Sequence, residues 1–163
     1  MPAYLLSVLT RQLALGPDQF LMRYPHSWLV WEVGGWTIPE TSPVAETRVE
    51  GPPKSAPSGD ALCFALKAPE GMPIRLGRGV ENEIVIADAT VSRFHARLEM
   101  KDRVWSVTPV NDPALVGQEV VGPGNSQQLA SGQAIELGSV RLAYYDSKSF
   151  RQRVSTVPLR PSR

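Results

Sequence analysis

The chain has a single cysteine, Cys63, among its 163 residues, so no disulfide can form within one copy. Such sparse use of cysteine is typical of proteins that stay in a reducing compartment. Histidines are also few, His26 and His95, and no group of cysteines and histidines has the spacing of a zinc site. We therefore expect no metal and no cofactor.

The chain also lacks long hydrophobic runs and a strong net charge. No apolar run approaches the roughly 20 residues of a membrane-spanning helix. The N-terminal apolar run has no basic leader and is interrupted by Arg11, which argues against a signal peptide. The net charge is only +1, so no overall field favours nucleic acid or a membrane surface. We expect a cytoplasmic protein.

Motifs of catalysis and of nucleotide binding are missing as well. Ser92 and His95 are close in sequence, but no glycine flanks Ser92, so the turn that exposes a nucleophilic serine is absent. Gly77 and Gly79 lack the third glycine of a dinucleotide loop, and no Gly-Lys-Ser/Thr follows them. The sequence therefore indicates a binding protein rather than an enzyme.

Residues 1–38 have the pattern of a small helical extension. Leucines recur at helical spacing over residues 4–15, and Gly16 followed by Pro17 marks the end of that helix. A second short helix from Pro17 and a strand over 28–33, which holds two tryptophans, are expected next. This apolar density favours packing against the main domain, with a docking site for a partner as the alternative.

Two segments are predicted to have no fold of their own. Residues 39–60 hold five prolines and almost no large apolar side chain, so they cannot offset the entropy cost of ordering and should form a linker. Its Thr41, Ser42 and Thr47 are either ordinary solvated residues or kinase targets. Residues 148–163 carry five bases and no acid. We expect a disordered tail, either simply solvated or able to meet an acidic partner or nucleic acid.

Residues 61–147 have the pattern of an all-β domain. Short apolar runs follow one another and are separated by turn sequences such as Gly122-Pro123-Gly124-Asn125. The expected strands are 61–67, 74–76, 84–86, 95–100, 104–107, 134–137 and 140–145. Many short strands with such turns are typical of a sandwich or barrel. The predicted fold class is all-β, a sandwich of short antiparallel strands with a small helical N-terminal extension.

The most informative stretch is RLGRGVENEIVIADATVSRFHARL, which begins at Arg75. A short strand in its middle is flanked by two loops, and loops at the ends of a rigid sheet often carry binding residues. Arg78, in the first loop, offers a planar fork of donors that suits phosphate. Ser92 adds a hydroxyl in the second loop, and Arg93 a second guanidinium. Together these residues predict an anion site for phosphate.

The residue types in this stretch follow a distinctive pattern. Its members are Gly77, Arg78, Asn82, Ile84, Ile86, Asp88, Val91, Ser92, Arg93, His95 and Ala96. In type and mutual spacing they resemble the core signature of the forkhead-associated (FHA) domain family. The likeness extends more weakly to Leu142 and covers roughly residues 61–146. It implies an FHA-type β-sandwich that binds phosphothreonine in partner proteins.

The resemblance also implies a role for individual residues. Those that would contact the phosphopeptide are Arg78, Ser92, Arg93 and Asn111, and those that would brace the loops are Asn82 and His95. In the family, the residues that match Arg78, Ser92 and Asn111 hold the phosphate or the peptide backbone. Arg93 is either a second phosphate contact or an ordinary exposed arginine. The second group holds the binding loops in place without touching phosphate.

The chain departs from the family pattern beyond Trp105. Where the family usually has Asn-Gly-Thr, this chain has Asn111-Asp112-Pro113. Proline pushes the residue before it toward extended conformations. The carboxylate of Asp112 also brings negative charge near the predicted anion site. We expect this change to weaken phosphate binding without abolishing it.

Two functional hypotheses remain. In the first, the chain is a phosphothreonine-peptide recognition module, a signalling adaptor downstream of Ser/Thr protein kinases. Its partner would be a phosphothreonine-containing protein or peptide, a kinase or a kinase substrate. In the second, it is a protein-interaction or scaffold domain of the same fold that does not bind phosphate, and its partner surface is the tryptophan-bearing N-terminal segment. Neither hypothesis involves nucleic acid or a membrane.

Overall fold

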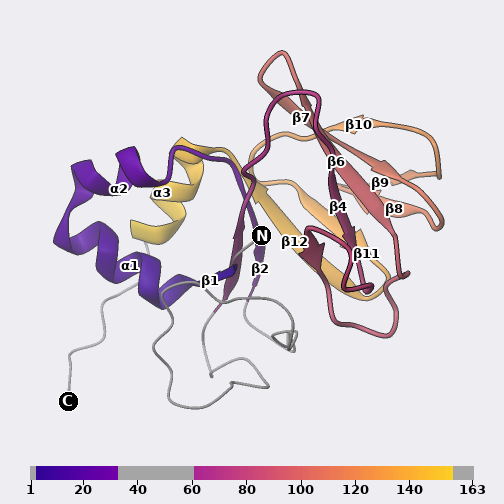
Figure 1. Cartoon of the computed structure of the whole chain (residues 1–163), viewed down its shortest axis with the longest axis horizontal. Helices are drawn as coiled ribbons and strands as arrows, with labels where there is room; N and C mark the ends of the chain where they lie inside the picture. Colours follow the sequence, from indigo (N-terminus) through magenta and orange to yellow (C-terminus); the bar gives the residue numbers. More distant parts are fainter. Residues whose placement is uncertain (1–2, 33–60, 156–163) are drawn as a thin grey trace.

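Two β-sheets packed face to face form the body of the molecule, and three helices lie on the outer side of one sheet (Figure 1). The computed structural model describes residues 3–32 and 61–155. The predicted linker over 39–60 lies outside these residues, as does the end of the predicted tail over 156–163. The prediction of an all-β sandwich with a few helices near the N-terminus is confirmed.

The larger sheet has seven strands in the order β1-β3-β2-β12-β11-β8-β9. In that order their bounds are Ala3–Leu5, Leu62–Ala65, Trp28–Trp31, Val140–Tyr145, Ala134–Leu137, Ala114–Val116 and Glu119–Val121. Neighbouring strands in this sheet pair antiparallel. The sequence pattern predicted β2, β3, β11 and β12. It did not predict β1, β8 and β9, because a three-residue strand is too short to show alternation.

The smaller sheet has five strands in the order β10-β7-β6-β4-β5. In that order their bounds are Gln127–Gln128, Val104–Pro109, Ala96–Lys101, Ile74–Gly77 and Ile84–Val85. The β4–β5 pair is parallel, unlike the antiparallel pairing expected throughout. Because β5 is only two residues long, this exception is confined to the edge of the sheet.

Strand β2 lies in the middle of the larger sheet, between β3 and β12. Leu29 and Trp31 face the space between the sheets, whereas Trp28 and Val30 face the helices. Both faces of β2 are covered, one by the smaller sheet and the other by the helices, which explains why its four residues are all apolar. The sandwich therefore begins before residue 61, where the sequence pattern placed its start. Both tryptophans are buried, so they offer no surface to a partner.

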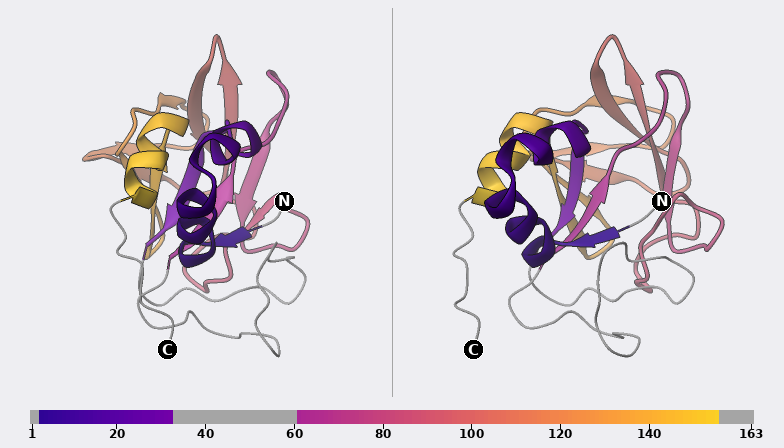
Figure 2. Two further views of the ribbon diagram at one scale, coloured as in Figure 1. Left: turned by 90° about the vertical axis from the view of Figure 1, so that its left-hand side faces the viewer. Right: turned by 60° about the vertical axis from the view of Figure 1, so that its left-hand side comes forward.

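Helices α1 (Leu6–Leu15) and α2 (Pro17–Arg23) stand where the leucine spacing and the Gly16-Pro17 break predicted them. A third helix, α3 (Ser147–Ser155), follows the last strand. α1 and α3 lie side by side on the larger sheet (Figure 2). In the described part of the chain, no helix combines the length and the hydrophobicity needed to cross a membrane.

Helix α3 occupies the start of the segment that was predicted to be disordered. Phe150 and Val154, one helical turn apart, are both buried. Phe150 stacks on Trp28 with ring centroids 4.2 Å apart and planes at 11°. On the solvent side, Arg153 forms an ion pair with Glu32 at 2.7 Å. The expectation of disorder is therefore wrong for residues 148–155, because these contacts order the helix.

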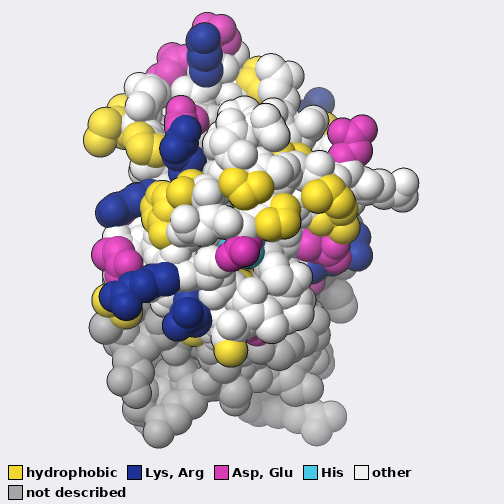
Figure 3. All heavy atoms as spheres, turned by 90° about the vertical axis from the view of Figure 1, so that its right-hand side faces the viewer, with side chains coloured by type: hydrophobic (Ala, Val, Ile, Leu, Met, Phe, Trp, Pro, Cys, Tyr) yellow, Lys and Arg dark blue, Asp and Glu magenta, His cyan; other side chains and the backbone are white. Residues whose placement is uncertain are grey.

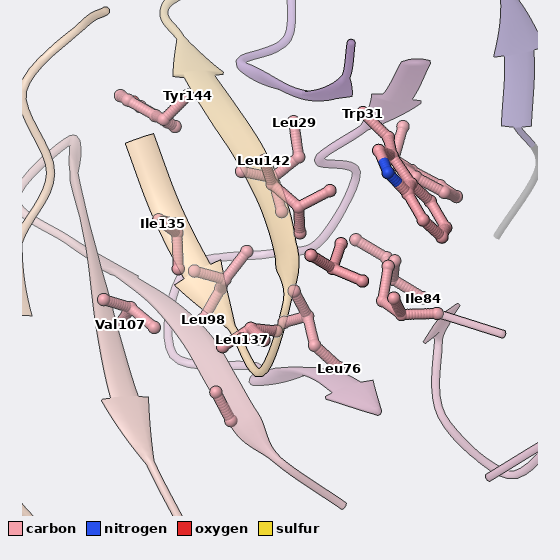
Figure 4. Packing of buried hydrophobic residues seen from close by; sticks show 14 of the residues in the cluster. Leu29, Trp31, Leu76, Ile84, Leu98, Val107, Ile135, Leu137, Leu142 and Tyr144 are labelled. Atoms are coloured by element: carbon pink, nitrogen blue, oxygen red, sulfur yellow. The ribbon is translucent and has the colours of Figure 1, made fainter. Parts of the chain in front are cut away.

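The main core fills the space between the two sheets with aliphatic side chains (Figure 4). Leu29 and Leu142 from the larger sheet, and Leu98 and Val107 from the smaller, are completely buried. Burial of a side chain of this size contributes about 1.5–3 kcal/mol. This core fixes the two sheets relative to each other, and with them the loops at their ends.

Candidate functional site

Three loops meet at one end of the smaller sheet. The register pairs Leu76 with Ala96 and Ala96 with Pro109, so the end of β4, the start of β6 and the end of β7 lie together. The loops that leave these points span residues 78–83, 86–95 and 110–113. They lie at the end of the sandwich away from the β6–β7 turn, which points upward in Figure 1. We call this end the loop rim.

The backbone brings Arg78 and Ser92 side by side at the loop rim. The Arg78 N–H donates to the Ser92 carbonyl at 2.9 Å, and the Gly79 N–H donates to the Arg93 carbonyl at the same distance. Gly77 permits this approach, because a Cβ atom there would lie 2.3 Å from the Arg93 carbonyl oxygen. Two residues that are distant in sequence, both predicted to bind phosphate, thus become neighbours.

The side chain of Arg78 extends over the second loop and is exposed to solvent. Its Nε donates to the Val91 carbonyl at 3.1 Å. This bond holds the guanidinium against the loop that carries Ser92, which is itself half-buried. A guanidinium held on the loop that carries a serine hydroxyl supplies two kinds of donor that can bond an oxyanion.

His95 connects the second loop to the third. It is 2% exposed, and its Nδ1 accepts the Ser92 backbone N–H at 3.1 Å. Because Nδ1 accepts, the ring proton lies on Nε2, which donates to the Pro113 carbonyl at 3.0 Å. The imidazole therefore holds residues 92 and 113 at a fixed separation, in the position of a loop-bracing residue.

Asn82 connects the first loop to the second. It is buried, and its Nδ2 donates to the carbonyls of Gly79 and Arg93, both at 2.7 Å. Its Oδ1 is buried and has no hydrogen-bond partner among the described residues. The two amide bonds span the base of the loop rim. Asn82 is thus also placed to brace the loops.

The two remaining predicted contact residues are present at the loop rim but have partners of their own. Asn111 is exposed, and its Nδ2 donates to the Phe94 carbonyl at 2.8 Å. Arg93 is exposed and lies 3.1 Å from a Glu81 carboxylate oxygen. The pKa of Glu81 is lowered, first by a hydrogen bond from its own backbone and next by Arg93. Only the Nε of Arg93 bonds Glu81 in the described part of the chain, and a guanidinium has further N–H groups that can bond a ligand.

Asp112 lies directly at the predicted anion site. Its carboxylate Oδ2 accepts the hydrogen bond that the Ser92 hydroxyl donates. The sequence predicted that the carboxylate of Asp112 would bring negative charge near the anion site. The structure shows that this charge is bonded to the very hydroxyl expected to hold phosphate.

A fourth segment, the β11–β12 turn, supports the loop rim and was not predicted to do so. The Thr90 hydroxyl lies 2.8 Å from the Ser139 hydroxyl and accepts the Ser139 N–H at 2.9 Å. Asp88 accepts the N–H and the hydroxyl of Thr90, which lowers the pKa of its carboxyl. Gly138 has φ of +59°, and a Cβ there would lie 2.2 Å from the Thr90 carbonyl oxygen. This glycine was the only sequence signal of the contact.

The loop rim presents a guanidinium, hydroxyl groups and a carboxylate. In residues 3–32 and 61–155, no cluster of histidine, cysteine or acidic side chains could hold a metal ion. The side of the sandwich away from the helices carries basic and acidic side chains interspersed, rather than one continuous field (Figure 3). A broad basic face, as expected of a nucleic-acid binder, is not seen on this side.

Comparisons with known proteins identify the family. The FHA domain family matches residues 74–138, which include the first two loops and Asn111. The oxoglutarate dehydrogenase inhibitor of Corynebacterium efficiens is 33% identical over 98 residues, covering 54% of this chain and 67% of that protein. Its counterpart from Corynebacterium diphtheriae is 35% identical over 72 residues, and the match spans 43% of this chain and about half, 48%, of that relative.

Among solved structures, the FHA domain of an Arabidopsis thaliana hypothetical protein superimposes with a TM-score of 0.50 at 26% identity. The match covers 76% of this chain and 87% of that domain. Sequence and architecture thus agree with the signature recognised around Arg78 and Ser92. This chain belongs to the FHA domain family.

Proposed function

We propose that this chain is a phosphothreonine-peptide recognition module that acts as a signalling adaptor downstream of Ser/Thr protein kinases. The observation that carries the proposal is the backbone pairing of Arg78 with Ser92 at the loop rim, where the Arg78 guanidinium bonds the carbonyl of Val91, the residue before Ser92. A permanent charge next to a hydroxyl donor suits a phosphate dianion. The absence of catalytic motifs noted in the sequence favours binding without turnover.

In this mechanism, Arg78 and Ser92 donate hydrogen bonds to phosphate oxygens. Arg93 adds a second guanidinium through the N–H groups that do not face Glu81, and Asn111 bonds the peptide backbone beside the phosphothreonine. Asn82 and His95 keep the three loops at a fixed separation. Because the loops are already bonded together, little order has to be created on binding, which favours affinity.

The names of the two corynebacterial relatives, which are inhibitors of oxoglutarate dehydrogenase, support a regulatory role for this chain. We propose that its partner is a protein whose activity changes when this chain binds a phosphorylated segment of it. The partner class is then a phosphothreonine-containing protein, a kinase or a kinase substrate.

Titration of phosphothreonine peptides against their unphosphorylated twins tests the proposal. We expect preference for the phosphorylated set and its loss in Arg78→Ala and Ser92→Ala. Each hydrogen bond to a charged group contributes about 1.5–3 kcal/mol, so each variant should lose about ten- to a hundredfold in affinity. Arg97→Ala is a matched control, since Arg97 is an exposed arginine in β6 that pairs with Glu99. Equal binding of both sets by the wild-type chain would reject the proposal.

A second candidate function is that of an interaction or scaffold domain without phosphate binding. The specific observation in its favour is the hydrogen bond from Ser92 to the Asp112 carboxylate, which occupies the anion site with a group of the chain itself. The tryptophans of β2 no longer provide the partner surface for this hypothesis, because both are buried. Equal binding of phosphorylated and unphosphorylated peptides would favour it.

A further inference from the structure

The Asp112 carboxylate is held at Ser92 by the residues on either side of it. Asn111 donates to the Phe94 carbonyl at 2.8 Å, and the carbonyl of Pro113 accepts from His95 at 3.0 Å. Both partners belong to the loop that carries Ser92. The bonds of Asn111 and Pro113 therefore hold the chain at Asp112 beside the Ser92 loop, and the bond to the Ser92 hydroxyl holds its carboxylate.

A phosphate group and the Asp112 carboxylate cannot use Ser92 at the same time. A serine hydroxyl has one hydrogen to donate, and in the structure it goes to Asp112. Two anionic groups that approach the same hydroxyl also repel each other. Binding of a phosphothreonine must therefore break the Ser92–Asp112 bond and leave a carboxylate beside a dianion.

The other acidic side chains at the loop rim already have partners within the protein. Glu81 is paired with Arg93, and Asp88 accepts two hydrogen bonds from Thr90. Asp112 differs from them, because its bond to Ser92 is the one that the ligand displaces. After displacement, its carboxylate would lie at the edge of the bound peptide and need a new donor.

We propose that Asp112 is a specificity-determining residue that selects phosphothreonine segments with an arginine or lysine close to the phosphothreonine. The inference rests on the proposed function and refines it. On binding, Ser92 exchanges Asp112 for the phosphate, and Asp112 exchanges Ser92 for a cation of the peptide. Arginine suits the exchange better than lysine, because its fork can bond a carboxylate through two N–H groups.

The test uses the full chain and a series of phosphothreonine peptides. Each peptide carries one arginine at one of the three positions on either side of the phosphothreonine and glutamine at the others, and an all-glutamine peptide is the reference. For the wild type we expect at least one arginine position to raise affinity by about two- to fivefold, the range of an exposed ion pair. The gain should decrease as salt is added.

Asp112→Asn should change this pattern in two ways. It should bind the all-glutamine phosphopeptide several-fold more tightly than the wild type does, and it should lose the gain from arginine. Asp102→Asn is the matched control: Asp102 is exposed in the turn at the other end of the sheet, so removal of its charge should change neither quantity.

The outcomes separate this inference from the function on which it rests. Phosphorylation-dependent binding with the same arginine gain in Asp112→Asn as in the wild type would overturn the role of Asp112 and leave the proposed function intact. Equal affinity of phosphorylated and unphosphorylated peptides for the wild type would overturn both. A thermal unfolding curve for Asp112→Asn that matches the wild type would attribute an altered affinity to the site rather than to the fold.

Discussion

Different interactions stabilise two regions of the molecule: the helix-covered face of the larger sheet and the loop rim of the smaller sheet. Beneath the helices, Tyr4, Tyr24, Trp28 and Phe150 form a chain of aromatic contacts with centroids 4.2–5.7 Å apart, and all four are buried. At the loop rim, polar side chains, from the exposed Arg78 to the buried Asn82 and His95, are held by hydrogen bonds to backbone groups. We infer that stability resides mainly in the first region and binding in the second.

This division of roles between the two regions explains how a small chain can have a stable fold and also carry a binding site. Aromatic pairs add about 0.5–1.5 kcal/mol each beyond the area that they bury. Hydrogen bonds at the loop rim bury little apolar surface, but they are directional and fix where the donor groups point. Substitutions should therefore divide into those that unfold the chain and those that only change what it binds.

The largest effect on stability is expected for Trp28→Ala. Trp28 is completely buried and contacts aromatic rings from three other segments. Replacement of a buried Trp by Ala costs about 3–5 kcal/mol, which urea unfolding followed by circular dichroism would measure. Trp28→Phe is the control and should cost much less, because the indole Nε1 has no hydrogen-bond partner in the described part of the chain. If Trp28→Ala lowered the free energy of unfolding by less than about 1 kcal/mol, stability would not reside mainly in the aromatic contacts under the helices.

Phe150→Ala should have the next largest effect and tests whether α3 belongs to the fold. Loss of a buried phenylalanine costs about 3 kcal/mol or more, so the midpoint of urea unfolding should fall clearly. Gln152→Ala on the exposed side of the same helix should leave it unchanged. Phosphopeptide affinity, measured well below the midpoint, should be the same in all three proteins. A fall in affinity with Phe150→Ala would show that the two regions are coupled.

The sequence predicted most strands, because alternation and turn residues are local signals. It did not predict α3, because only Phe150 and Val154 are apolar at helical spacing in a segment of mixed polar and basic residues. A short helix owes its stability mainly to tertiary packing, and the ring that packs on Phe150, that of Trp28, is far away in sequence. The central place of β2 was missed for the same reason: strand order is not a local property.

The candidate site was predictable in residue identity but not in detail. The spacing of Arg78 and Ser92 indicated two loops at one end of a sheet, and the backbone pairing agrees with it. The bond between Ser92 and Asp112 depends on where His95 and Asn111 hold the third loop, which no local pattern encodes. The negative charge of Asp112 could be predicted from the sequence, whereas its bond to Ser92 could be seen only in the folded structure.

His95→Ala should affect both properties to an intermediate extent. It removes the bonds to the Ser92 N–H and the Pro113 carbonyl and leaves buried groups without partners, at a cost of about 1–3 kcal/mol. Because the same bonds hold the two loops together, phosphopeptide affinity should also decrease. His26→Ala is the control, since His26 lies in a cleft with Lys67 and Met100 rather than at the loops. Unchanged affinity in a destabilised His95→Ala would limit His95 to a purely structural role.

The smallest effect is expected for Glu83→Gln, and it should depend on pH. The pKa of the Glu83 carboxyl is lowered, first by hydrogen bonds from the Arg75 side chain. A carboxyl with a lowered folded-state pKa stabilises the protein when the pH is above its unfolded-state pKa, and this stabilisation is lost as the pH falls through the folded-state pKa. Because the pair is partly exposed, solvent screening limits its contribution to about 1 kcal/mol or less.

Urea unfolding of wild type and Glu83→Gln at neutral pH and at about pH 3, below the ordinary glutamate pKa, would measure this dependence. We expect the wild type to be slightly more stable at neutral pH and the difference to shrink as the pH falls and Glu83 takes up a proton. Glu99→Gln is the matched control: the Arg97–Glu99 pair is also exposed, but Arg97 bonds Glu99 through Nε, whereas Arg75 bonds Glu83 through both Nε and Nη2. We therefore expect its difference to vary less with pH. If the stability difference between wild type and Glu83→Gln grew in acid, the predicted direction of the pH dependence would be wrong. A difference as large as that of Trp28→Ala would mean that polar contacts beside the loop rim, and not only the aromatic layer under the helices, hold the fold together.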